Sequence, residues 1–419
     1  MQPNENHLSK LQSIAQSLCD ELLEVLNKYK EKYTGEYNTG DVVYFCVVAL
    51  IKSLTIVAFS QLGPEGFKHA PNLLTSILTS LTKAGKFESA AECLTHLINQ
   101  YELSNEVSLS DRRIILISGD VSLDQFGIPL ELYHNLSEKI DLIYHGAAHI
   151  NRMTSYAKLR SYYAQGTSEI IKFALQKFNK PIHYISTLYS ALPFDKKHRL
   201  TETFLDTNIN LTLDNYAMSQ WVAERLLAQI KNRGLPVCIY RVGHLSGQTN
   251  NGITYPHNEF FILVKGCIQL KCAPKRTQKI LLQPIDFVSK AIVSISLHSL
   301  EKSNVFQFDL PKKILFTQII AWLNDHGYAI KLSKYPEWLH ALSEIHFDNA
   351  LYPLLPYYLA KTNEPITPII ETSHTDKILN ELNIAYPSID QAFLQKTIQY
   401  LCQIGFLPAP HGKKKQILI

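Results

Sequence analysis

The sequence predicts an α/β fold: a doubly wound parallel sheet with a smaller, mostly helical C-terminal lobe and an N-terminal helical extension. From Leu54 onward, short apolar runs alternate with amphipathic helical patterns, which is typical of a parallel sheet wound by helices. These runs are largely apolar, as expected for strands that are covered on both faces. Beyond about Phe308 the pattern becomes helical, with prolines between the helices.

The elements follow from the spacing of the apolar residues. Apolar residues recur at three- and four-residue steps between residues 8 and 33, which predicts an amphipathic helix there. Strands are expected at 54–59, 113–118, 141–145, 181–186, 236–241 and 304–309. Between them, helical periodicity predicts helices over 90–101, 168–178 and 218–232.

The same patterns divide the chain into parts. Residues 1–53 form the helical extension, 54–310 the α/β domain, 311–410 the C-terminal lobe and 411–419 a basic tail. The lobe has apolar mass of its own, from Trp322, Trp338, Phe393 and Leu401. It is therefore expected to be a packed lobe rather than a linker.

Charge and cysteine content exclude several classes of protein. The net charge is +4, and the only basic block is Lys413–Lys415, so no stripe suited to nucleic acid is present. The 7 cysteines are scattered without a CxxC pair, which argues against a disulfide framework and a metal site and favours a reducing, cytoplasmic compartment. The 17 glycines are only about 4% of the chain, where about 7% is usual.

One apolar stretch, residues 42–59, is long enough to raise the question of a membrane span. It is interrupted by Lys52 and Ser53 and barely reaches the length needed to cross a bilayer. We therefore expect two buried elements there, the second a strand, and no transmembrane span. No secretory signal peptide is recognised at the start of the sequence.

Small and polar residues follow the predicted strands where doubly wound sheets bind their ligands, at the strand C-termini. They occur in the segments ISGDVS (Gly119, Asp120), YHGAAHIN (Ala147, Ala148), HYISTLYS (Ser186, Thr187) and IYRVGHLSG (Gly243). In the helical segment NYAMSQWVAERLL, Tyr216 and Gln220 are four residues apart and share a face. Any one of these segments could be an ordinary turn or helix face, but their combination in this order indicates a nucleotide-dependent site.

Together these segments resemble the thioester reductase domains of the extended short-chain dehydrogenase/reductase class, which end nonribosomal peptide and polyketide assembly lines and carboxylic acid reductases. They are similar to that family's GD-[LV]-S, HxAAxVN, YxxLRxxNVxGT, HYVSTLS, YAxSKWVAE and YRxGxIxG blocks. The resemblance extends over roughly residues 54 to 410, and the blocks taken together are far more specific than a lone fingerprint.

The resemblance implies a Rossmann-like NAD(P)-binding reductase domain with a C-terminal substrate-binding lobe. Thr187 and Tyr216 would be the catalytic hydroxyls, binding the carbonyl oxygen of an acyl thioester while NADPH delivers hydride. The acyl group would be carried on the phosphopantetheine arm of a carrier protein or on CoA, and the product would be an aldehyde or an alcohol. Two preorganised donors at the developing oxyanion meet the electrostatic need of such a reaction.

Several residues depart from the family pattern on the cofactor side. Gln220 stands where the family has a lysine that binds the cofactor ribose and lowers the tyrosine pKa. An amide brings no charge, and a cation 4 Å from an oxyanion is worth about 4 kcal/mol at an effective dielectric constant near 20. Tyr163 replaces the asparagine of NVxGT, and of the family's two arginine positions that select NADP, Lys83 keeps a cation and Cys93 does not.

The family's glycine-rich turn aligns with FSQLGPEG, in which Gly63 and Gly66 remain and Ser60 replaces the first glycine. A non-glycine residue held at positive φ there would cost about 1–3 kcal/mol. Two interpretations stay open: a degenerate cofactor turn, or a segment that is not the cofactor turn. Two functions accordingly stay open, an NADPH-dependent thioester reductase and a degenerate relative that binds an acyl carrier or protein partner without redox activity.

Overall fold

The computed structural model describes residues 46–49, 55–59, 90–104, 115–117, 119–148, 153–189, 199–205, 214–276, 279–298, 302–360 and 369–410. The chain divides into two compact units: 1–242, 289–308 and 370–383 form unit 1, and 243–288, 309–369 and 384–419 form unit 2. The division thus differs from a single boundary at 310, because 243–288 joins unit 2 and 370–383 joins unit 1. The predicted helix at 8–33 and the basic tail lie outside the described residues.

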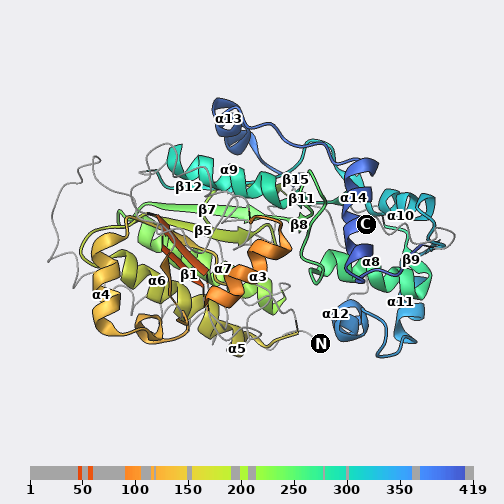
Figure 1. Ribbon diagram of the computed structural model, residues 1–419, viewed down its shortest axis with the longest axis horizontal. Helices are drawn as coiled ribbons and strands as arrows, with labels where there is room; N and C mark the ends of the chain where they lie inside the picture. The colour runs from red at the N-terminus through yellow and green to blue at the C-terminus, as the bar shows by residue number, and fades with distance from the viewer. Residues whose placement is uncertain are drawn as a thin grey trace. The chain divides into compact units, whose positions relative to one another are not determined.

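Among the described residues, unit 1 is built on a seven-stranded sheet of order β12-β7-β5-β4-β2-β1-β3 (Figure 1). The strands are β12 (Asn304–Gln307), β7 (Val237–Val242), β5 (Ile182–Thr187), β4 (Leu142–His145), β2 (Thr55–Phe59), β1 (Cys46–Ala49) and β3 (Ile115–Leu116). Strands β12, β7, β5 and β4 pair in parallel, and so do β1 and β3. The predicted strands are therefore confirmed, and the α/β class with them.

Strand β2 corrects the expectation of a parallel sheet, because it runs antiparallel to both of its neighbours. Its residues Ile56 and Phe59 pair with His145 and Leu142 of β4. The reason lies in the connection: Ala49 and Thr55 are too close in sequence for the crossover that parallel strands need, so β1 and β2 pair antiparallel. Phe59 consequently lies level with the start of β4, at the edge opposite the C-termini of β4 and β5.

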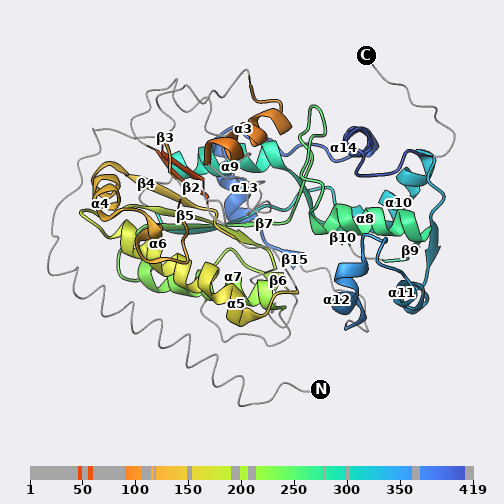
Figure 2. The ribbon, with the colours of Figure 1, turned by 60° about the horizontal axis from the view of Figure 1, so that its bottom comes forward.

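Helices cover both faces of this sheet, which makes it doubly wound. In Figures 1 and 2, α6 (Gly166–Ala174) and α7 (Asn215–Lys231) lie on one face and α9 (Ile285–His298) on the other. The core toward α6 and α7 is centred on fully buried aliphatic residues, and Ile143, Ile171, Ile182, Ala223, Leu227, Val237 and Ile239 are all at 0% exposure. Unit 1 also contains β6 (Arg199–Leu200), α3 (Ala90–Gln100), α4 (Leu130–Lys139), α5 (Tyr156–Arg160) and α13 (Ser373–Glu381).

Unit 2 is mostly helical, as predicted for the C-terminal lobe. Its helices are α8 (Glu259–Leu270), α10 (Phe316–Asp325), α11 (Tyr335–Ser343), α12 (Leu355–Leu359) and α14 (Gln391–Gln403). Short strands pair as β8 (His244–Ser246) with β11 (Leu282–Pro284), β9 (Cys272–Pro274) with β14 (Lys331–Ser333), and β10 (Lys279–Ile280) with β13 (Ile314–Leu315). Trp338, Phe393 and Leu401 lie in its core, as expected from the apolar mass of the lobe.

The described part of segment 42–59 consists of the two strands β1 and β2, in agreement with the prediction of two elements. Within the described ranges, no helix combines the length and the apolar character that crossing a membrane requires.

Candidate active site

Helix α7 places Tyr216 and Gln220 on the face that packs toward the sheet. The helix begins after Asp214, whose carboxylate accepts a hydrogen bond from the Ala217 N–H at 2.9 Å and caps the first turn. Tyr216, Gln220 and Glu224 follow at four-residue steps, and all are buried. A polar stripe therefore runs along the buried face of a helix that is otherwise packed with apolar residues.

Strand β5 presents hydroxyl groups to this stripe at two successive positions. Side chains two residues apart on a strand share a face, so Tyr184 and Ser186 both face α7. The Tyr184 hydroxyl donates to Gln220 Oε1, and the Ser186 hydroxyl donates to Glu224 Oε1 at 2.5 Å. Gln220 completes the chain by donating from Nε2 to the Tyr216 hydroxyl oxygen at 3.3 Å.

Thr187 is the last residue of β5 and is 6% exposed. Its Oγ1 accepts a hydrogen bond from the Tyr189 N–H at 3.3 Å, which holds the turn that follows the strand. Thr187 and Ser186 thus lie at the carboxyl edge of the parallel strands, where the sequence placed them.

Tyr216 packs into a small buried cluster with Ala148, Leu159 and Tyr163. Tyr163 lies in a π-helical segment, Ser161–Gln165, between α5 and α6, and its ring meets the Tyr216 ring edge-on at a centroid distance of 6.0 Å. The residue that replaces the family asparagine therefore contacts the predicted catalytic tyrosine. Single π turns inside helices frequently mark functional sites.

A second, deeper layer supports the stripe and was not identified from the sequence. Glu224 accepts from Arg241 Nη2 at 2.8 Å, and the two side chains are 0% and 1% exposed. Arg241 also donates to Gln307 Oε1 at 3.2 Å and to the backbone oxygens of Thr201 and Thr203. The signals were present in the sequence: Glu224 continues the Tyr216–Gln220 spacing, and Arg241 interrupts an apolar strand.

Burial determines the protonation states of Tyr184 and His145. Burial, reinforced by the nearby Glu224 and Tyr216, raises the pKa of Tyr184 well above its usual value, so this hydroxyl remains a donor. Burial lowers the pKa of His145 to about 3, and its neutral ring lies 5.0 Å from the Tyr184 ring and hydrogen-bonds Thr167 at 3.1 Å. Tyr184, which hydrogen-bonds Gln220, is therefore a neutral phenol, and the His145 ring beside it is a neutral imidazole.

The predicted cofactor residues are described in part. Gly119 and Asp120 follow β3 and are half-buried, and the Asp120 carboxylate accepts from Ser122 N–H at 2.9 Å and from Ser122 Oγ at 2.7 Å. Ala147 and Ala148 follow β4 and are buried, and Gly243 begins unit 2. Ser60, Gly63, Gly66 and Lys83 lie outside the described residues.

Gly243 is required for close backbone packing within unit 2. A Cβ at this position would lie 2.8 Å from the Leu281 carbonyl oxygen. Its N–H donates to Gln283 Oε1 at 2.9 Å. Both contacts tie the residue to the β10–β11 region of its own unit.

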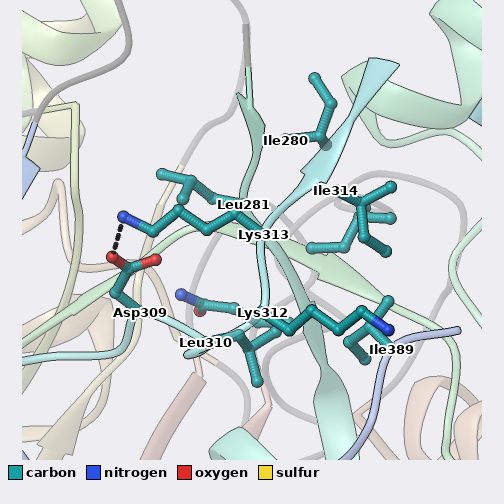
Figure 3. Close-up of a pocket in the computed structure, with 10 residues that line it drawn as sticks. Ile280, Leu281, Asp309, Leu310, Lys312, Lys313, Ile314 and Ile389 are labelled. Atoms are coloured by element: carbon teal, nitrogen blue, oxygen red, sulfur yellow. Dashed lines mark ion pairs between the residues drawn. The ribbon is translucent and has the colours of Figure 1, made fainter. Parts of the chain in front are cut away.

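A pocket in unit 2 is distinct from the predicted site residues (Figure 3). Apolar side chains, among them Ile280, Ile314 and Ile389, line a cavity of about 10 Å³, and Lys313 forms an ion pair with Asp309 at 2.5 Å. This volume has room for about one water molecule and is far below the range of about 300–1,000 Å³ that ligand sites occupy. We therefore assign no substrate to it.

The fold and the buried tyrosine–amide stripe define an NAD(P)-binding domain of the short-chain dehydrogenase/reductase type. Residues 72–292, just over half of the chain, match the model of the family described as Male sterility protein. The chain belongs to this family, and within it is a member of the thioester reductase domains.

Individual relatives agree with this assignment. The chain is 27% identical over 334 residues to a linear gramicidin synthase protein of Brevibacillus parabrevis, covering 78% of this chain and 6% of that protein. It is 27% identical over 343 residues to L-2-aminoadipate reductase of Saccharomyces cerevisiae, covering 75% and 24%. The chain thus spans a quarter or less of these curated relatives. The terminal R domain of the myxalamid PKS-NRPS pathway matches with a TM-score of 0.70 and 29% identity, covering 77% of this chain and 82% of that domain.

The described residues suit a nicotinamide cofactor, which the family binds. The Gln220 amide uses one N–H and one oxygen lone pair within the protein, so a second N–H and a second lone pair match a ribose hydroxyl. The Asp120 carboxylate uses one oxygen for Ser122, and its other oxygen suits a ligand donor. Residues 60–66 lie outside the described residues, so both interpretations of the segment FSQLGPEG stay open.

Proposed function

We propose that this chain is an NADPH-dependent reductase that converts acyl thioesters, on a carrier protein or CoA, to an aldehyde or an alcohol. The observation that carries the proposal is the hydrogen-bonded chain Tyr184–Gln220–Tyr216 beside the C-terminus of β5. It occupies the carboxyl edge where this class of sheet binds its ligands.

In this proposal Thr187 and Tyr216 donate hydrogen bonds to the thioester carbonyl oxygen. A bound nicotinamide would supply the hydride. As negative charge develops on the oxygen, Tyr216 transfers its proton there, and the resulting hemithioacetal releases the thiol to leave the aldehyde. The burial of Tyr216 and Thr187, at 8% and 6% exposure, keeps competing water away from these hydroxyls.

Gln220 supports Tyr216 through a hydrogen bond rather than a charge. Its N–H stabilises the tyrosine oxygen that is left after proton transfer. Because reduction uses Tyr216 as a proton donor, the tyrosine need not be ionised beforehand, and we expect the chain to turn over. Because an amide carries no charge, we expect this turnover to be slower than with a lysine at this position.

The remaining parts of the proposal concern the cofactor and partners. We assign Gly119, Asp120, Ala147, Ala148, Ser186 and Gly243 to the cofactor side, with Lys83 selecting NADPH over NADH. The name of one related structure, a thiolation-reductase di-domain of an archaeal synthetase, supports a carrier protein as the partner. Free thiols within the described ranges support a reducing, cytoplasmic location; they are Cys238, Cys267, Cys272 and Cys402.

The proposal is tested by titrating NADPH against the melting temperature and then following NADPH oxidation with acyl-CoA and acyl-carrier substrates. We expect stabilisation by NADPH, and turnover that Thr187→Val or Tyr216→Phe each abolishes. Gln220→Lys should raise the rate. If millimolar NADPH produces no thermal shift, the reductase proposal is wrong, and the non-redox relative becomes the function to test.

A further inference from the structure

We propose that Tyr184 is a positioning residue that orients the Gln220 amide, and through it the proton of Tyr216. The inference rests on the proposed reductase function, in which Tyr216 is the acid. It assigns a role to a strand residue that lies outside the predicted catalytic set.

The argument begins with the asymmetry of an amide. One end of a glutamine side chain only accepts hydrogen bonds and the other only donates. A half-turn about the last side-chain bond exchanges the two ends, so the helix alone does not decide which end meets Tyr216. A fixed neighbour has to decide it.

Tyr184 is that neighbour. It lies on β5 facing α7, is 1% exposed, and donates its hydroxyl proton to Gln220 Oε1. This hydroxyl, which burial keeps protonated, gives its proton to Oε1 and so holds the oxygen end of the amide. The nitrogen end is left for Tyr216, at 3.3 Å from its hydroxyl oxygen.

The orientation matters for catalysis. When Gln220 Nε2 donates to Tyr216, the phenol oxygen is an acceptor, and its proton can be given to the substrate. With the amide reversed, Oε1 would accept that proton and hold it away from the substrate. The hydrogen bond from Nε2 also favours the phenolate that proton transfer leaves behind.

A lysine at this position would not need such a partner. Its ammonium carries three equivalent donors and no acceptor, so every rotamer presents a donor to Tyr216. The role of Tyr184 is therefore coupled to Gln220 in this chain. The coupling is measurable because the effects of substitutions at the two positions on kcat should not be additive.

A double-mutant cycle of Tyr184→Phe and Gln220→Met on the full chain tests the inference by activity. We expect Tyr184→Phe to lower kcat about three- to tenfold with the KM values unchanged, the effect of one lost hydrogen bond. In the Gln220→Met and Gln220→Lys backgrounds the same change should have little effect on kcat. An equal loss in all backgrounds would overturn the inference, since Tyr184 would then act without Gln220.

A second readout does not depend on turnover. With tyrosine labelled with ¹³C at Cζ and the Tyr216 signal assigned from Tyr216→Phe, Tyr184→Phe should shift the Tyr216 resonance. The same substitution in the Gln220→Met background should add no further shift. Tyr240→Phe is the matched control, because its hydroxyl bonds His183 at 2.8 Å on the neighbouring strand, and it should leave the Tyr216 signal in place.

The two readouts separate the possible failures. A Tyr216 signal that does not respond to Tyr184→Phe overturns the positioning role, even when the enzyme turns over. A coupled shift without NADPH oxidation in wild type or Gln220→Lys overturns the reductase function and leaves the orientation of the amide established.

Discussion

Glu224 and Arg241 form an ion pair that is closed off from solvent on both sides. Arg241 Nη2 lies 2.8 Å from Glu224 Oε2, with side-chain exposures of 1% and 0%. Glu224 Oε1 also accepts from Ser186, so the pair is joined to the strand end that precedes Thr187. The ion pair thus links the interior of unit 1 to the candidate active site.

Removing one partner of this pair should be strongly destabilising, because the remaining charge is buried. We expect Glu224→Ala to lower the free energy of unfolding by about 3–5 kcal/mol, measured by chemical denaturation. The control is Lys177→Ala, which removes an ion pair with Glu138 at 2.7 Å whose side chains are 43% and 56% exposed. That change should cost far less, because both charges of this pair are exposed to water, and equal costs for the two variants would contradict the expectation.

Two variants of Asp120 distinguish a structural role of its carboxylate from a role in binding NADPH. Asp120→Asn keeps an acceptor for Ser122 and should preserve the turn, whereas Asp120→Ala should lower stability by about 1 kcal/mol. If the carboxylate contacts the cofactor, both variants weaken NADPH binding in a calorimetric titration. Unchanged binding by the asparagine variant would restrict Asp120 to the turn.

Acid should destabilise unit 1 through its buried histidines. Burial lowers the pKa of His183 to about 3, below its usual 6.5, so the unfolded chain binds a proton that the folded chain does not. Stability is therefore fully present above pH 6.5 and falls toward pH 3, by about 1.4 kcal/mol per pH unit for each such group. His183→Phe should reduce the slope of the free energy of unfolding against pH by that amount. An unchanged slope would show that His183 is not the group responsible.

Gly252 is a position in unit 2 where glycine is required by space as well as by conformation. Its φ is +73°, and an added Cβ would lie 2.4 Å from the Lys396 carbonyl carbon and 2.5 Å from the Thr397 nitrogen. Gly405 has a similar φ of +70° with nothing within 4 Å of such a Cβ. Gly405→Ala should cost about 1 kcal/mol and Gly252→Ala at least about 2 kcal/mol more, measured as melting temperatures. Equal shifts would show that backbone conformation alone sets the cost.

The candidate site could be predicted from the sequence where its signal is local. Tyr216 and Gln220 are one helical turn apart, and Ser186 and Thr187 end an apolar run, so periodicity alone puts them on a helix face and at a strand end. Tyr184 could not be assigned in this way. Its partner Gln220 is 36 residues away, and only the packing of α7 on β5 brings the two together.

By itself the sequence determined the α/β class, the position of six of the seven described strands of the main sheet and the helix face that carries Tyr216, because these depend on the spacing of apolar residues. The tertiary structure alone decided the direction of β2 and the pairing of Glu224 with Arg241. The pattern of apolar residues does not specify the direction of a strand in its sheet. Nor does the sequence show which residue pairs with a buried charge.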